Sequence, residues 1–164
     1  DGADECDMVL NYPILQGIYD LEENDEEFIR IYDELLDDVD ALSAECHKTT
    51  NKNGERTILK VIVESGLLNL DETELATNIC ILADADFIKT STGMVAVGAE
   101  LDKVQKIRQV INSTRGCDMK IKASGGIRTL ADLQKFAPYV DRFGVGFGAV
   151  DKIFGDSALD NDNY

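Results

Sequence analysis

The chain has 164 residues and a formal net charge of -16, with 44% apolar and 29% charged residues. This length suits one domain with a sizeable core, and the composition indicates a folded, soluble protein. So strong a negative charge argues against nucleic acid or an anionic membrane as a partner. The apolar runs are short, so no transmembrane helix is predicted, and the acidic first residues lack the order of a signal peptide. They indicate instead a chain that is entered in mid-domain.

The cysteines and the histidine argue against several kinds of site. Four cysteines are dispersed without metal-ligand or redox spacing, and the only histidine, His47, lies in a predicted polar turn. Cys6 and Cys80 fall within apolar segments, which is typical of core residues in a reducing compartment, and we expect a cytoplasmic protein. The sequence predicts no metal site, no cofactor and no histidine-based triad.

Strand and helix patterns alternate along the chain. Strands are predicted at 6–12, 57–64, 86–91, 119–124 and 142–146, and helices at 21–45, 70–84, 100–113, 129–140 and 148–155. In the second helix, Asp71 is the expected N-cap, with Glu74 three positions further on. The alternation predicts one domain, residues 1–155, with a parallel sheet and helical crossovers. Residues 156–164 are expected to form a flexible acidic tail.

Two parallel architectures are compatible with this alternation, the open doubly wound sheet and the eight-stranded barrel. The segment NYPILQG after the first strand is not a dinucleotide-binding fingerprint, and Walker-type spacing is absent from the sequence. Polar residues stand at the carboxyl ends of several strands, where barrel enzymes build their sites. The barrel is therefore favoured.

Charged residues share one face of four predicted strands. Asp7, Lys60, Lys89 and Lys122 each belong to a different strand, and in a barrel the face they share points into the interior. One acid and three lysines could therefore converge. The alternative is that Lys60 and Lys122 reach the rim, or pair with Glu64 and Asp7.

A lysine amine attacks a carbonyl only when it is unprotonated, and both burial and a neighbouring cation favour loss of its proton. Lys89, with Lys122 on the next strand, meets these conditions. An iminium on Lys89 would act as an electron sink for breaking or forming a carbon–carbon bond, and Asp7 is the available acid for moving protons. The pattern predicts a metal-independent Schiff-base aldolase.

Glycine-rich turns follow the last two strands. Gly125 and Gly126 lie in SGGIRT, and Gly144 and Gly146 lie in GVGFGA. Such turns expose backbone N–H groups to an anion, and in barrels this is the usual phosphate site. The alternative is that they are ordinary loop glycines.

Four segments resemble the deoxyribose-phosphate aldolase family: GADECDMVLNY, LKVIVESGLL, ADFIKTSTGMVAVGAE and KASGGIRT. They occur in the family's order, at similar intervals, over most of the chain. The resemblance implies a (β/α)8 barrel, of which this chain would hold strands four to eight. It also implies reversible cleavage of 2-deoxy-D-ribose 5-phosphate to glyceraldehyde 3-phosphate and acetaldehyde, in deoxyribonucleotide catabolism and without a metal or cofactor.

The resemblance assigns roles to individual residues. Lys89 is implied to be the Schiff-base lysine, Lys122 the lysine that activates it, and Asp7 the acid of the proton relay. The implied substrate and phosphate contacts are Lys60, Thr90, Gly125, Gly126, Gly144 and Gly146. In some members a terminal tyrosine visits the site, which is the position of Tyr164 here.

Three departures keep other interpretations open. The family's first strands are missing, Gly146 and Phe147 stand where many members have phosphate-binding serines, and Met94 stands where some have a further lysine. The chain could be a catalytically impaired barrel remnant that binds a sugar phosphate or a partner chain, or a lysine aldolase for another aldehyde. Because a partial barrel exposes two sheet edges, a homo-oligomer or strand complementation is expected.

Overall fold

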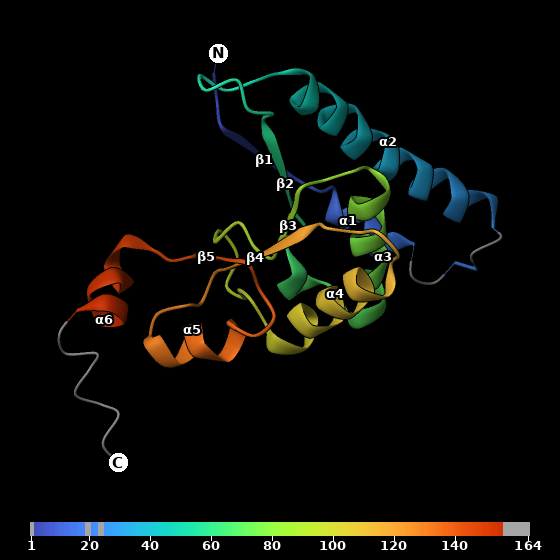
Figure 1. The fold of residues 1–164 in the computed structure, drawn as a ribbon. Coiled ribbons are helices and arrows are strands. Elements are labelled where there is room, and N and C mark those ends of the chain that lie inside the picture. The colour runs from blue at the N-terminus through green and yellow to red at the C-terminus, as the bar shows by residue number, and fades with distance from the viewer. Residues whose placement is uncertain (1, 19–20, 23–24, 156–164) are drawn as a thin grey trace.

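Five parallel strands form the sheet at the centre of the fold (Figure 1). The structure is a computed structural model that describes residues 2–18, 21–22 and 25–155. Helical segments separate successive strands, so the predicted crossover pattern is confirmed. The strands are β1 (Glu5–Val9), β2 (Ile58–Ile62), β3 (Phe87–Lys89), β4 (Lys120–Ser124) and β5 (Arg142–Gly144).

The order of the strands distinguishes the two candidate architectures. Neighbours in the sheet are neighbours in sequence, β1-β2-β3-β4-β5. A doubly wound sheet reverses its order at a switch point, whereas a barrel keeps it. The sheet is also strongly curved, because Arg142 Nη1 on one edge strand lies 2.7 Å from Glu5 Oε1 on the other. The prediction of part of a (β/α) barrel is therefore confirmed.

Helices cover one side of this curved sheet. Helices α2, α3 and α4 pack side by side, with α2 against β2 and α4 against β4, and α5 and α6 follow towards the end of the chain (Figure 1). The helices are α1 (Tyr12–Gly17), α2 (Glu26–Lys48), α3 (Leu70–Leu82), α4 (Leu101–Ser113), α5 (Leu130–Phe136) and α6 (Val150–Phe154). Short 3-10 turns span Ser65–Leu67 and Phe147–Ala149.

The main core lies between the sheet and these helices. Leu59, Val61, Ile88 and Ile121 alternate with the charged strand residues and are almost completely buried. Burial of each such side chain contributes about 1.5–3 kcal/mol. Cys80 of α3 lies in the same core, as predicted, and burial raises the pKa of its thiol to about 12. The packing of one face fixes the opposite, charged face on the concave side of the sheet.

Helix α3 begins at a different cap from the predicted one. Asn69 is the N-cap: its side chain accepts a hydrogen bond from the Glu72 backbone N–H (2.9 Å), and the Glu72 carboxylate accepts one from the Asn69 N–H (2.7 Å). The assignment of Asp71 as the cap is wrong because this reciprocal capping box lies two residues earlier in the chain. Asp71 lies instead in the first turn, where an acid suits the helix dipole.

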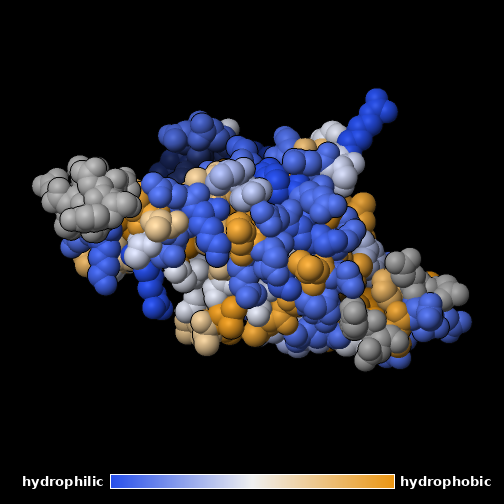
Figure 2. Space-filling view, turned by 90° about the horizontal axis from the view of Figure 1, so that it is seen from below, coloured by the Kyte–Doolittle hydropathy of each residue, from blue (hydrophilic) through white to orange (hydrophobic). Residues whose placement is uncertain are grey.

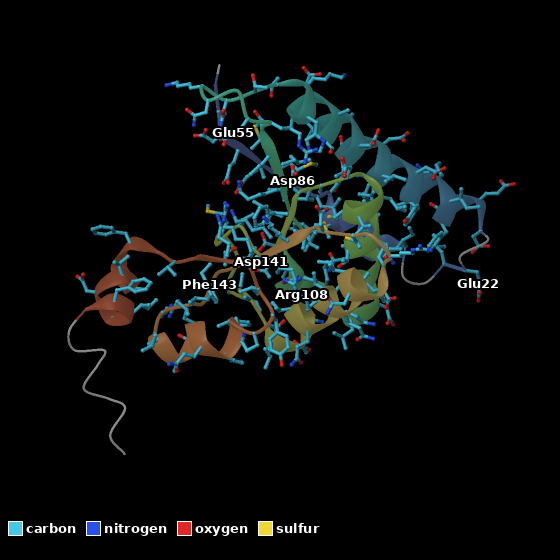
Figure 3. The ribbon with its side chains drawn as sticks, viewed as in Figure 1. Glu22, Glu55, Asp86, Arg108, Asp141 and Phe143 are labelled. Carbon is cyan, nitrogen blue, oxygen red and sulfur yellow. The ribbon has the colours of Figure 1, made fainter. Side chains whose placement is uncertain are left out.

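His47 lies in the last turn of α2 rather than in a polar turn, so that prediction is also wrong. Its Nε2 is 3.0 Å from the carboxylate of Asp86, which is labelled in Figure 3. The same carboxylate accepts from the Leu59 N–H and pairs with Arg56. The histidine therefore ties the end of α2 to the start of β3, away from the concave face.

Helix α1 was not predicted. The first strand was expected to run to Tyr12, but β1 ends at Val9 and a helix begins at Tyr12. Pro13 stands in its first turn, where the missing N–H of proline costs no helical hydrogen bond.

The face shown in Figure 2 is mostly hydrophilic, with apolar patches between the polar residues. Two of the large apolar side chains in the described part of the chain are almost fully exposed, Phe147 at 96% and Met94 at 88%. None of the described helices combines the length and apolarity needed to cross a membrane. The predicted tail, 156–164, lies outside the described residues.

Candidate active site

Charged side chains from all five strands lie on the concave face of the sheet. The register places Asp7 opposite Lys60, and Lys89 opposite Lys122. Lys122 is in turn opposite Arg142 of β5. Because neighbouring strands are about 4.8 Å apart, each of these side chains is within reach of the next. The predicted convergence of one acid and three lysines is therefore present in the structure.

Asp7 holds two of the lysines. Its Oδ1 lies 2.7 Å from Lys60 Nζ, and its Oδ2 lies 2.8 Å from Lys89 Nζ. Lys60 also contacts Glu5 at 2.8 Å and is only 3% exposed, whereas the Lys89 side chain is 14% exposed. Lys89 is thus ion-paired and lies nearer to solvent than Lys60.

The ion pairs alter the protonation equilibria of both acids and of Lys60. Burial raises the pKa of Asp7, but hydrogen bonds from Lys60 and Lys89 outweigh it and hold that pKa below its ordinary value. The hydrogen bond from Lys60, followed by that from Arg142, lowers the pKa of Glu5. Burial alone would lower the pKa of Lys60, but its hydrogen bonds to Asp7 and Glu5 raise it overall. Lys60 is therefore held as an ammonium ion.

Lys122 has the opposite shift. Burial, and next the positive charge of Lys89, lower the pKa of Lys122. No ion pair of Lys122 occurs within the described ranges. Gly144 on β5 leaves room for its stem, since a Cβ at that glycine would lie 3.3 Å from Lys122 Cε. Lys122 thus gives up its proton more readily than an ordinary lysine.

A cleft of about 540 Å³ opens beside this pair of lysines. Backbone turns after β4 and β5 and cationic side chains dominate its lining, which suits an anionic ligand. Its lining includes Lys89, Lys122, Gly125, Gly126, Arg128, Gly144, Gly146 and Lys152. In the described part of the chain, His, Cys, Asp and Glu residues form no group of three that could hold a metal ion.

The turn after β4 depends on glycine. Gly125 and Gly126 both have φ of +79°, in the left-handed region that other residues rarely adopt. The loop after β3 lies directly on this turn: a Cβ on Gly98 would be 2.3 Å from the Gly125 carbonyl. The Ala99 N–H also donates to the Gly125 carbonyl oxygen at 3.0 Å. Because Gly98 and Gly125 lack a side chain, the two backbones can meet closely. The turn with Gly125 and Gly126 forms one wall of the cleft.

Buried polar contacts hold the ends of β2, β3 and β4 in place. Thr90 is completely buried, and its hydroxyl donates to Ser124 O and accepts from Ser124 N, both at 2.9 Å. Glu64 is 1% exposed and accepts from the Thr92 hydroxyl at 2.6 Å. These contacts tie neighbouring strand ends together and position the loops that carry the cleft.

The structure brings most of the predicted site residues together. Lys89, Lys122 and the four glycines line the cleft, Asp7 contacts Lys89, and Lys60 contacts Asp7. Thr90 is placed beneath the site, with its hydroxyl used by Ser124. Tyr164 lies outside the described residues.

Four charged residues were not predicted. Glu5 and Arg142 join the ion-pair network, and Arg128 and Lys152 line the cleft. Glu5 lies two residues before Asp7, so strand alternation alone would have found it. The position of Arg142 depends on the curvature of the sheet, for which the sequence carries no direct signal.

Comparisons with known proteins agree with this geometry. The sequence profile of the DeoC/LacD family aldolases matches residues 1–147. The deoxyribose-phosphate aldolase of Mycoplasmopsis synoviae is 37% identical over 134 residues, 82% of this chain and 50% of that protein. That of Mycoplasmoides gallisepticum is 38% identical over 144 residues, 87% of this chain and 53% of that protein.

A crystal structure assigned to a deoxyribose-phosphate aldolase of Coccidioides immitis superposes with a TM-score of 0.74 at 33% identity. The superposition covers 95% of this chain and 53% of the Coccidioides immitis chain. The chain thus spans about half the length of the curated relatives that it matches. With a profile match over residues 1–147 and a shared arrangement of strands, the chain belongs to the DeoC/LacD family of aldolases.

Proposed function

We propose that the chain catalyses the reversible cleavage of 2-deoxy-D-ribose 5-phosphate to glyceraldehyde 3-phosphate and acetaldehyde, through an imine on Lys89. The observation that carries the proposal is the placement of Lys89 beside Lys122 in a cleft bounded by glycine turns. Relatives 37% and 38% identical to this chain are deoxyribose-phosphate aldolases, which supports the same substrate class.

Lys89 is the nucleophile in this proposal. Its amine adds to the aldehyde carbon of the open-chain sugar, and loss of water gives an iminium. The C3 hydroxyl then gives its proton to Asp7 through a water while the electrons of the C2–C3 bond flow into the iminium, which releases glyceraldehyde 3-phosphate and leaves an enamine on Lys89. Protonation of the enamine and hydrolysis release acetaldehyde. Lys122, whose pKa is lowered by burial and by Lys89, takes up the proton that Lys89 must lose before it attacks.

Asp7 moves protons during the same cycle. In the resting site it accepts from Lys89 at 2.8 Å, so its carboxylate already lies beside the atom that becomes the imine nitrogen. When Lys89 reacts, Asp7 keeps its contact with Lys60 and can pass protons through a bound water. Lys60 holds Asp7 in place and keeps it ionised.

The phosphate end of the substrate binds at the glycine turns. Gly125 and Gly126 present backbone to the cleft from the turn after β4, and Gly146 does so from the turn after β5. Arg128 and Lys152 line the same cleft and add positive charge. Where many family members have phosphate-binding serines in the second turn, this chain has Gly146 and Phe147. Phosphate affinity therefore rests on backbone donors and on the two cations.

Two specific observations favour alternative functions, either a lysine aldolase for a different aldehyde or a binding role. Met94 and Phe147 are exposed apolar side chains next to cleft-lining glycines, which favours a lysine aldolase for a less polar aldehyde. The outer edges of β1 and β5 have no strand partner among the described residues, which favours a binding remnant or a chain completed by a partner. We propose that the chain acts in the cytoplasm, as a homo-oligomer or with complementing strands.

Turnover of 2-deoxyribose 5-phosphate, measured on size-exclusion fractions of known mass, tests this proposal. We expect glyceraldehyde 3-phosphate and acetaldehyde in equal amounts, produced by a species larger than one chain. Cleavage of an unphosphorylated deoxy-sugar at a higher kcat/KM would support the aldolase for another aldehyde. A folded chain without turnover of either sugar would contradict the enzyme and leave the remnant. Full activity in a monomer would contradict the need for a partner.

A further inference from the structure

Glu5 and Arg142 extend the ion-pair network beyond the residues used in the proposed reaction. Arg142 Nη1 lies 2.7 Å and 2.8 Å from the two carboxylate oxygens of Glu5. Glu5 in turn accepts from Lys60 at 2.8 Å, and Lys60 contacts Asp7, which contacts Lys89. Neither Glu5 nor Arg142 lines the cleft. The result is an unbroken chain of alternating charges from β5 to the nucleophile.

Lys60 needs both acids. It is 3% exposed, and an ammonium ion so far from water is costly unless its hydrogen bonds are satisfied. Asp7 alone cannot supply this, because its second oxygen is committed to Lys89. Glu5 provides the second acceptor and thereby holds Lys60 in the position from which it fixes Asp7.

Arg142 keeps Glu5 in that position. Its guanidinium carbon lies 4.6 Å from the centre of the Phe87 ring, and Phe87 is 4% exposed. The ring attracts the guanidinium group and helps to hold it where it contacts Glu5 across the concave face. An aromatic side chain of β3 thus helps to join the first and last strands of the sheet.

The charged groups on this face come from every strand. They are Glu5 and Asp7 of β1, Lys60 of β2, Lys89 of β3, Lys120 and Lys122 of β4, and Arg142 of β5. Cations therefore outnumber acids, and the two acids set how far the positive charges are balanced. Removing one member of the Glu5–Arg142 pair changes this balance without touching the cleft lining.

We infer that Glu5 and Arg142 are positioning residues for the lysine pair: Arg142 clamps Glu5, Glu5 holds Lys60, and Lys60 fixes Asp7 beside Lys89. The inference deepens the proposed function and rests on it for the role of Lys89. Its consequence for Lys122 follows from electrostatics alone and can be measured whether or not the chain turns over substrate.

The two residues act on Lys122 in opposite directions. Glu5→Gln removes a negative charge, so the positive charge around Lys122 is less balanced and its neutral amine persists to lower pH. Arg142→Met removes a positive charge that contributes to the lowered pKa of Lys122, so its ammonium form persists to higher pH. A residue that acts only by supporting the fold gives no reason for shifts of opposite sign.

The test is competitive labelling of Lys122 with a dilute amine-reactive anhydride across a pH series, read by peptide mass spectrometry. We expect the midpoint of labelling to fall by about half a pH unit in Glu5→Gln and to rise by about as much in Arg142→Met. Imine formation on Lys89 can be trapped with cyanoborohydride at each pH. The pH at which it is half-maximal should shift in the same direction as the labelling midpoint in each variant.

Two matched variants serve as controls. Glu74→Gln removes a carboxylate that contacts Lys106 at 2.6 Å, and Arg108→Met removes a guanidinium that contacts Asp141 at 2.6 Å. The latter two residues are labelled in Figure 3. Both controls should leave the labelling midpoint of Lys122 unchanged. If Glu5→Gln does not fold, Arg142→Lys, which keeps the positive charge, takes its place. The labelling midpoint of Lys122 should then stay near that of the unmodified chain in Arg142→Lys and rise in Arg142→Met.

The outcomes separate the inference from the proposed function. Shifts of the same sign, no shift, or equal shifts in the controls would overturn the roles of Glu5 and Arg142, even if the chain is an active aldolase. Opposite shifts of Lys122 without any trapped imine would uphold the coupling of the Glu5–Arg142 pair to the lysine pair. The absence of a trapped imine would contradict the proposed function instead.

Discussion

Lys89→Met should lower the rate of 2-deoxyribose 5-phosphate cleavage by roughly a thousand-fold or more, because a thioether cannot form the imine on which every later step depends. Methionine has a similar length and no charge. Asp7 keeps its 2.7 Å contact with Lys60 in this variant, so the fold should survive. The assay is steady-state turnover at saturating substrate, with circular dichroism and a thermal midpoint as checks of folding.

Lys135→Met is the matched control for this experiment. Lys135 lies in the last turn of α5, is exposed, and is absent from the cleft lining. Its loss should leave kcat and KM unchanged. Comparable turnover in folded Lys89→Met and in Lys135→Met would show that another group is the nucleophile, and the assignment of Lys89 would have to be abandoned.

Gly98→Ala should unfold the chain more easily and weaken substrate binding at the same time. The added methyl group would lie 2.3 Å from the Gly125 carbonyl, so the loop after β3 must move away from the turn after β4. We expect a loss of about 2–3 kcal/mol in the free energy of unfolding. We also expect a rise of roughly ten-fold or more in KM, because the displaced turn carries the proposed phosphate site.

Gly17→Ala provides the comparison for this substitution. Gly17 lies in α1, and an added methyl group there meets no atom within 4 Å. The free energy of unfolding of Gly17→Ala should stay the same or rise slightly, since alanine favours a helix more than glycine does. Denaturant titration and steady-state kinetics measure both variants. An unchanged unfolding free energy and KM in Gly98→Ala would mean that the two backbones are not held in contact.

The alternation of strands and helices was predictable because each buried strand is a short apolar run between polar, helix-patterned segments. VIV at 61–63 is a continuous apolar run, whereas the apolar residues of α4 recur every three or four positions, at Leu101, Val104, Ile107 and Ile111. The ends of elements were harder to place. Val9 and Tyr12 belong to one apolar segment, and only packing shows that a strand ends at the first and a helix begins at the second.

Part of the geometry of the site was also predictable, since a buried lysine on an apolar strand is costly unless it is paired or used. Lys89 and Lys122 were expected to converge for this reason, and the register places them opposite each other. Thr90 was expected near the substrate, but its hydroxyl is buried against Ser124, a contact that depends on the register of β3 and β4. Arg142 was missed because its contact with Glu5 spans the whole curved sheet.

Trapping of the imine tests the central claim most directly. The chain is incubated with acetaldehyde and cyanoborohydride, digested, and searched by mass spectrometry for an ethyl group on each lysine, with exposed Lys48 and Lys135 as measures of unspecific labelling. We predict that Lys89 is modified well before either of these, and that deoxyribose 5-phosphate slows the modification by competing for the site. A folded chain in which Lys89 is labelled no faster than Lys48 and Lys135 would contradict the account.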